Sequence, residues 1–111
     1  GMHINALDQA RFGYLTLNKG KWNGRQLLSQ KWLAMAETPT KAEPGYGFMN
    51  FFLNTGRKAI PAAPESAFRH VGAGSNIIYV DRENGLVVVT RWIQGSALPE
   101  FIEKVLAAMP K

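Results

Sequence analysis

Two segments decide the fold of this chain: Asn76-Ile-Ile-Tyr-Val-Asp-Arg82 and Leu86-Val-Val-Val-Thr-Arg-Trp-Ile93. Both are strand-like in composition, and only a short turn separates them. Asn84-Gly85 lies between them and favours a two-residue type I′ turn, in which both central residues need a positive φ. Val87-Val88-Val89 presents apolar side chains to both faces of its strand, so we expect other elements to cover both faces.

Three helices are predicted around this hairpin. The first runs from about Leu7 to Leu17, and Asn5 is a favourable N-cap for it. The second runs from about Gln30 to Glu37, with Ser29 as its N-cap. The third runs from about Pro99 to Ala108. Its apolar stripe consists of Phe101, Ile102, Val105, Leu106 and Met109.

The remaining elements complete an α+β layout. The aromatic-rich stretch from Tyr46 to Leu53 predicts a third strand. Residues 55–66 contain one glycine and two prolines, and a loop of this length indicates either a functional loop or loose structure. The element order ααβββα predicts a single α+β domain over residues 1–111, with about three antiparallel strands packed against helices.

Composition narrows the function classes. Cysteine is absent, which excludes disulfides and thiolate chemistry. The only histidines are His3 and His70, and neither has a zinc-like spacing to acidic residues, so we expect no metal and no cofactor. The net charge is +5, but the basic residues are scattered and lack interleaved aromatics, so no nucleic-acid partner is expected. No apolar run approaches the length of a membrane span, and no compartment is indicated.

The sharpest candidate for chemistry is Phe68-Arg-His-Val-Gly-Ala-Gly-Ser75. It places His70 beside Gly72 and Gly74 just before a strand, where glycine allows another backbone or a substrate to approach closely. The competing interpretation is a glycine-rich turn that contains an incidental histidine. Residue spacing alone leaves both open.

No activated nucleophile is visible. The four serines are Ser29, Ser66, Ser75 and Ser96. None lies in a G-x-S-x-G elbow, and none is followed by lysine in an S-x-x-K motif. Trp32 and Trp92 are expected to be core residues rather than ligand-stacking platforms.

Several stretches together resemble the serine β-lactamase-like family, which includes class C β-lactamases, penicillin-binding proteins, D-aminopeptidases and related esterases. The stretches are Asp8-Gln-Ala-Arg-Phe-Gly13, Leu17-Asn-Lys-Gly20, Trp22-Asn-Gly-Arg-Gln-Leu-Leu-Ser29, Trp32, Tyr46-Gly-Phe48, His70-Val-Gly72 and Ile78-Tyr-Val-Asp81 with Leu86-Val-Val-Val89. His70-Val-Gly72 resembles the third active-site motif, K-T-G or H-x-G. The resemblance covers nearly all of the chain, in the order and spacing of the second half of family members.

This resemblance implies a partial β-lactamase-like fold and acyl-transfer chemistry on an amide or ester. It also implies that His70, Val71 and Gly72 line the substrate cleft, with His70 partly exposed at one end of the hairpin's first strand. The S-x-x-K and Y-x-[NS] motifs have no counterpart here, and in the family both lie upstream. We therefore expect a C-terminal fragment of a larger hydrolase domain that lacks its N-terminal catalytic part and is inactive alone.

Two alternatives remain: a standalone binding module that uses the concave side of the sheet, and an interaction domain that assembles through a sheet edge. Three strands leave an edge unpaired, and the terminal helix covers one sheet face only. These features predict a homodimer through the exposed edge or an apolar face. A monomer in which the 55–66 loop folds over the gap is the competing expectation.

Overall fold

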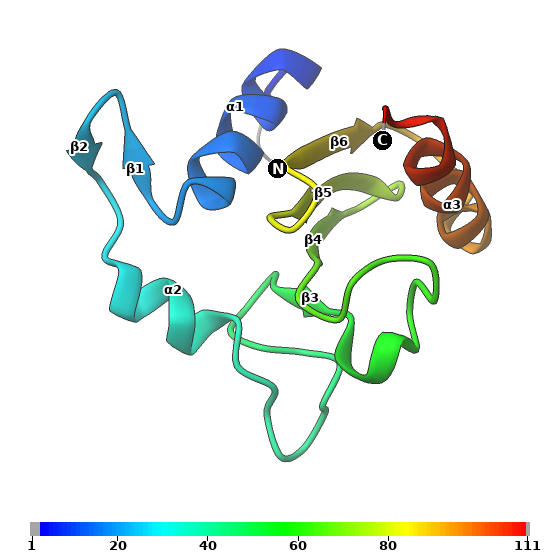
Figure 1. Ribbon diagram of the computed structural model, residues 1–111, viewed down its shortest axis with the longest axis horizontal. Helices are drawn as coiled ribbons and strands as arrows, with labels where there is room; N and C mark the ends of the chain where they lie inside the picture. The colour runs from blue at the N-terminus through cyan, green and yellow to red at the C-terminus, as the bar shows by residue number, and fades with distance from the viewer. Residues whose placement is uncertain (1–2, 111) are drawn as a thin grey trace.

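The structure, a computed structural model, describes residues 3–110. Its middle layer is a four-stranded antiparallel sheet with the strand order β3-β4-β5-β6 (Figure 1). The strands are β3 (Phe52–Leu53), β4 (Phe68–Gly72), β5 (Asn76–Asp81) and β6 (Leu86–Thr90). The α+β class is confirmed, and the sheet has four strands where about three were predicted, since β4 is an additional strand.

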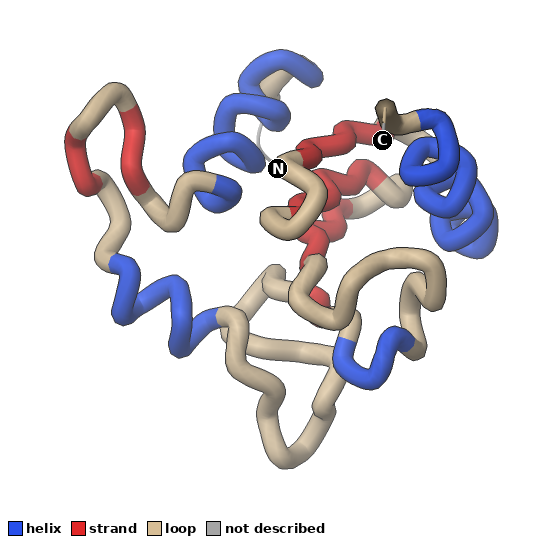
Figure 2. The backbone as a smooth tube through the Cα atoms, in the orientation of Figure 1, coloured by secondary structure: helices blue, strands red, loops and turns tan. Residues whose placement is uncertain are grey.

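Helices lie on both faces of this sheet. Figures 1 and 2 show α1 (Ala6–Leu17) and α3 (Leu98–Ala108) on opposite sides of the strands, with α2 (Gln30–Ala36) below α1 in this view, towards β3. The expected caps are confirmed: Asn5 Oδ1 accepts a hydrogen bond from the Asp8 amide at 2.8 Å, and Ser29 Oγ accepts one from the Trp32 amide at 2.9 Å. Short 3₁₀ turns, η1 (Thr55–Arg57) and η2 (Gly95–Ala97), complete the chain.

Two hydrophobic cores lie on the two faces of the sheet. The core on the α1 and α2 side comprises Leu33, Ala36, Phe51, Leu53, Phe68, Ile78 and Val80. The core on the α3 side comprises Ile60, Ala63, Ala67, Ile77, Tyr79, Leu98 and Ile102. Alternate residues of β5 therefore enter opposite cores, as the two-residue period of a strand requires.

The valine run of β6 is covered on both faces, as predicted. Val87 and Val89 pack against the first core, and Val88 packs against the second. Helix α1 approaches closely at Gly13, where a Cβ atom would lie 2.6 Å from Val87 Cγ1. Helix α3 covers one face only, as expected, and α1 covers the other, so the sheet lacks the open face that the dimer prediction assumed.

The turn between β5 and β6 differs from the prediction. Asp81 pairs with Leu86, which leaves four residues in the loop, and of Asn84 and Gly85 only Gly85 has a positive φ, at 61°. The buried Asp81 carboxylate accepts hydrogen bonds from the Asn84 amide at 3.0 Å and from Asn84 Nδ2 at 2.7 Å, and so holds Asn84 in the longer loop.

A two-residue Asn-Gly turn occurs elsewhere, in the segment predicted as a turn-rich link. Strands β1 (Lys21–Trp22) and β2 (Arg25–Gln26) form a small separate hairpin. Asn23 and Gly24 connect them with φ values of 49° and 78°, as a type I′ turn requires.

The strand predicted over 46–53 is wrong for most of its length. Only Phe52 and Leu53 lie in β3, and Tyr46 forms an isolated bridge with Phe52. Between them the chain folds back, with the Gly47 amide donating to the Phe51 carbonyl at 2.9 Å. Asn50 has a φ of 65°, which ends the extended conformation.

The loop over 55–66 is packed rather than loose. Asn54 is 1% exposed, and its Nδ2 donates to the carbonyls of Ile60, Ala63 and Pro64 at 3.0–3.3 Å. Its Oδ1 accepts the Ile60 amide at 2.8 Å. The loop consequently delivers Ile60 and Ala63 to the α3-side core.

Trp92 is not a core residue. It is 72% exposed. Its φ of 58° is not a strand conformation, and β6 ends at Thr90, two residues before it. Its ring lies over Gly74, where a Cβ atom would be 2.0 Å from Trp92 Cζ3. Trp32 is likewise 43% exposed.

Replacing Asn54 with alanine should lower the free energy of unfolding by about 3 kcal/mol, because it leaves several buried backbone groups of the 55–66 loop without partners. Urea unfolding monitored by tryptophan fluorescence measures this loss. Asn18→Ala is the matched control: its Nδ2 donates to the Tyr14 carbonyl at an exposed helix end, so the loss should stay under about 1 kcal/mol. Equal losses in the two variants would contradict the role assigned to Asn54.

Candidate functional site

His70 lies at the middle of β4, paired with Ile78 of β5. On the other side of β4, strand β3 pairs only with Phe68 and Arg69 and does not reach His70. Asn50 lies beside His70 instead. His70 Nδ1 is 2.8 Å from the Asn50 carbonyl oxygen, and the Val71 amide donates to Asn50 Oδ1 at 3.1 Å. His70 is only 4% exposed, so the expectation of a partly exposed residue at one end of the hairpin's first strand is wrong.

Three phenylalanine rings surround the imidazole of His70. Its ring centroid lies 4.7 Å from that of Phe51, 5.2 Å from Phe12 and 5.6 Å from Phe68, each in an edge-to-face arrangement. Burial lowers the pKa of His70 below its ordinary value. The hydrogen bond to Asn50 and the charge of Glu37 act in the opposite direction and only partly offset this effect.

The contact with Asn50 determines the tautomer. A carbonyl oxygen only accepts, so Nδ1 carries the proton and donates to it. In the neutral ring, Nε2 is then an acceptor with a free lone pair. Nε2 is buried and has no hydrogen-bond partner among the described residues, and the same holds for Gln9 Oε1 on α1.

A cavity of about 570 Å³ lies against these groups. Its lining includes Ile4, Gln9, Phe12, His70, Ile78 and Arg91. Gly72 also lines it, and a Cβ atom there would be in ordinary contact with Asn76 alone, 3.7 Å from its carbonyl oxygen and 4.0 Å from its Cβ. The cavity thus combines apolar walls with two unpaired acceptors, an arrangement typical of small-molecule sites.

The three residues predicted to line a cleft do not all line the same cavity. His70 and Gly72 line the same cavity. Val71 points to the opposite face of the sheet, where it packs against the α3-side core and lines a smaller cavity of about 270 Å³. The alternation of side chains along β4 separates it from its two neighbours.

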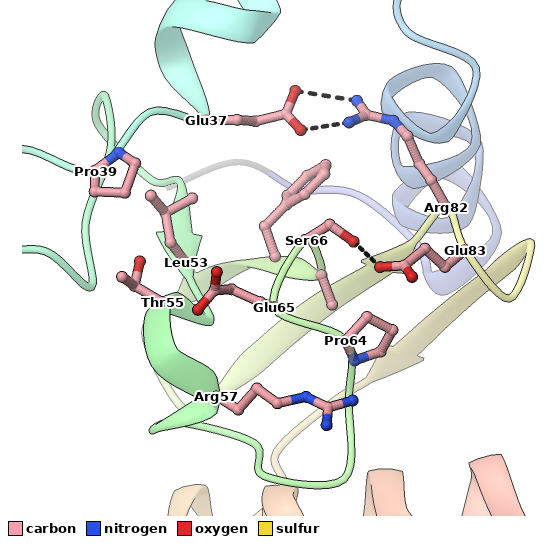
Figure 3. A pocket seen from close by; sticks show the side chains of 12 residues that line it. Glu37, Pro39, Leu53, Thr55, Arg57, Pro64, Glu65, Ser66, Arg82 and Glu83 are labelled. Carbon is pink, nitrogen blue, oxygen red and sulfur yellow. Dashed lines mark hydrogen bonds and ion pairs between the residues drawn. The ribbon is translucent and has the colours of Figure 1, made fainter.

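A larger cavity of about 610 Å³ lies at the other end of β4 (Figure 3). Its polar side chains pair with one another: Glu37 receives two hydrogen bonds from Arg82, and Ser66 donates to Glu83. Arg57 Nε donates to the Ala63 carbonyl at 2.9 Å. Because these groups hold the structure together and are already satisfied, the His70 cavity is the better candidate for function.

Four residues of the site were not identified from the sequence: Gln9, Phe12, Asn50 and Arg91. Gln9 and Phe12 lie on the predicted first helix, and no local pattern connects them to His70. Asn50 carried a usable signal, since asparagine is among the residues that most often adopt a positive φ, but it was assigned to a strand.

Within residues 3–110, no three His, Asp or Glu side chains come together as metal ligands. Of the helices in this part of the chain, none combines the length and apolarity that a membrane crossing requires.

No protein-family model and no curated protein matches this chain. A solved structure from Bacillus anthracis, described as a "putative 6-aminohexanoate-dimer hydrolase", is similar, with a TM-score of 0.61 and 26% sequence identity. The similarity covers 96% of this chain and 30% of that protein, so the chain spans less than a third of its neighbour's length. The neighbour's description is that of a hydrolase, and the likeness links this chain to β-lactamase-like serine hydrolases coarsely, at the level of the fold alone.

The depressed pKa of His70 predicts a pH dependence of stability. The unfolded chain binds a proton to this residue at a higher pH than the folded chain does. The contribution of His70 to the free energy of unfolding is therefore fully present above about pH 6.5, and it is lost as the pH drops towards the folded-state pKa. Urea midpoints at pH 7.5 and pH 5.5 measure the loss.

His70→Phe is the matched variant, because it keeps an aromatic ring among Phe12, Phe51 and Phe68 but does not titrate. Its midpoint should change less between the two pH values than that of the unmodified chain. An equal change in both proteins would mean that His70 titrates normally or is not buried.

Proposed function

We propose that this chain acts as part of a β-lactamase-like serine hydrolase, as the C-terminal portion of its catalytic domain. The observation that carries the proposal is His70-x-Gly72 on the wall of a cavity, within a fold similar to a hydrolase over 96% of the chain. The reaction class is acyl transfer from an amide or ester.

The proposed role of His70 follows from its chemistry. A neutral imidazole whose Nδ1 is held by a backbone carbonyl presents Nε2 in a fixed direction as a hydrogen-bond acceptor or proton carrier. General acid–base groups need a controlled orientation of this kind. Gly72 leaves room beside the strand for a substrate.

The nucleophile must come from residues outside this chain. None of the four serines lines the His70 cavity. Ser29 caps α2, and Ser66 donates its hydroxyl hydrogen to Glu83. Acyl transfer needs a serine with an adjacent base, so the proposal places S-x-x-K and its tyrosine partner on another segment of the hydrolase.

The isolated chain should hydrolyse neither nitrocefin nor p-nitrophenyl esters above background, and a fluorescent penicillin should not acylate it. The physical reason is the absence of an activated nucleophile at the cavity. Mass spectrometry after incubation with the penicillin checks for an adduct. A stoichiometric acyl adduct would contradict the proposal that the nucleophile lies outside this chain.

A chimera tests whether this chain supports catalysis when the rest of a hydrolase is present. This chain replaces the segment of the Bacillus anthracis hydrolase to which it is similar, and ester hydrolysis is measured. His70→Ala in the chimera should lower the kcat of the folded enzyme by about a hundredfold, and it should also lower stability, because it removes a buried ring. His3→Ala, the substitution of the other histidine, should leave both kcat and stability unchanged. Large destabilisation with normal turnover would identify His70 as a structural residue.

One observation favours a second candidate function, self-association. Strand β6 is the edge of the sheet, and all five of its residues are half-buried. The run Leu86-Val-Val-Val-Thr90 contains none of the lysines or prolines with which natural edge strands avoid pairing. Antiparallel pairing of two copies centred on Val88 would place Leu86 opposite Thr90 without any like-charge contact.

Sedimentation equilibrium at micromolar concentration should then give twice the chain mass of 12.3 kDa. Thr90→Lys should restore the single-chain mass by placing a charge on the paired edge. Ala107→Lys adds the same charge at an exposed position on α3 and should leave the dimer intact. A clean 12.3 kDa species for the unmodified chain would contradict this second function.

A further inference from the structure

Both unpaired acceptors at the His70 cavity lack a hydrogen-bond donor within residues 3–110. His70 on β4 and Gln9 on α1 line one cavity, and their buried Nε2 and Oε1 atoms have no donor among the described residues. We propose that this cavity binds a small neutral molecule that carries a hydroxyl or N–H donor on an apolar body. The proposal deepens the function proposed above, since it names a ligand chemistry for the same site.

A donor is required because both atoms can only accept. The proton of His70 is committed to the Asn50 carbonyl through Nδ1, so Nε2 keeps its lone pair. The amide oxygen of Gln9 is an acceptor in any state. Buried acceptors without partners cost free energy, and a ligand that supplies a donor recovers it.

A neutral ligand is required because either charge is disfavoured. A carboxylate at the two acceptors would face two lone pairs, and the Nη1 of Arg91, the cation that lines this cavity, already donates to the Ile4 carbonyl at 3.1 Å. A cation would lose its hydration against the apolar side chains of Phe12, Ile4 and Ile78 and would also meet Arg91. The walls instead favour an aromatic or aliphatic body, which buries apolar area against them.

Phe12 controls access to Nε2, which is itself shielded from solvent. Of the three rings around the imidazole, Phe51 and Phe68 are buried, whereas Phe12 is 43% exposed and lines the cavity. An exposed side chain changes rotamer readily. The proposed path by which a donor reaches the imidazole is a rotation of Phe12 on α1.

Phenol and benzene are the matched probes, because they share the apolar ring and differ in the hydroxyl group. Amide shift changes in ¹H–¹⁵N spectra of the whole chain, titrated with each probe, give the two dissociation constants. Phenol should bind at least about fivefold more tightly than benzene, with the largest shifts at Gly72, Ala73 and the β4 amides. His70→Phe should lower that ratio by removing one of the two acceptors.

Gln9→Met tests the second acceptor and serves if His70→Phe does not fold. It should lower the phenol-to-benzene preference, whereas Gln30→Met, the same substitution at an exposed position on α2, should leave that preference unchanged. Equal affinities of the unmodified chain for phenol and benzene, or binding of neither, would overturn the proposal. Binding is measured without turnover, so this failure is separate from failure of the chimera to hydrolyse esters.

Discussion

The constraint on which this fold depends is the two-faced hairpin of β5 and β6. Ile77 and Tyr79 enter one core while Ile78 and Val80 enter the other, so neither face of the sheet can remain in water. Helix α1 covers one face through the close approach at Gly13. Helix α3 covers the other, and the 55–66 loop, tied down by Asn54, fills the space beside it.

The site is a consequence of this double cover. Strand β3 is two residues long and ends before His70, so the free edge of β4 is closed by the backbone and side chain of Asn50. Core packing from Phe51 and Phe68 then buries the imidazole and lowers its pKa. The hydrogen bond from His70 Nδ1 to the Asn50 carbonyl fixes the tautomer, which leaves Nε2 unpaired beside the cavity next to α1.

Local signals predicted much of this fold. The caps at Asn5 and Ser29, the three helices and the β5–β6 hairpin follow from side-chain periodicity and N-cap chemistry, which act within a few residues. The type I′ turn at Asn84-Gly85 failed because Asp81 captures Asn84, a contact that composition does not reveal. Of the site, only His70 and Gly72 were identified in advance. Gln9 and Asn50 reach His70 only through packing between distant segments, so no local pattern indicates them.

The central claim is that His70 is a buried, neutral imidazole with its proton on Nδ1 and a free acceptor at Nε2. Long-range ¹H–¹⁵N correlation spectra of the histidine ring at pH 7 test it most directly. The structure predicts a protonated Nδ1, an unprotonated Nε2, and a ring that takes up its second proton at a lower pH than an ordinary histidine. A protonated Nε2 at pH 7, as the other tautomer or as imidazolium, would contradict the account.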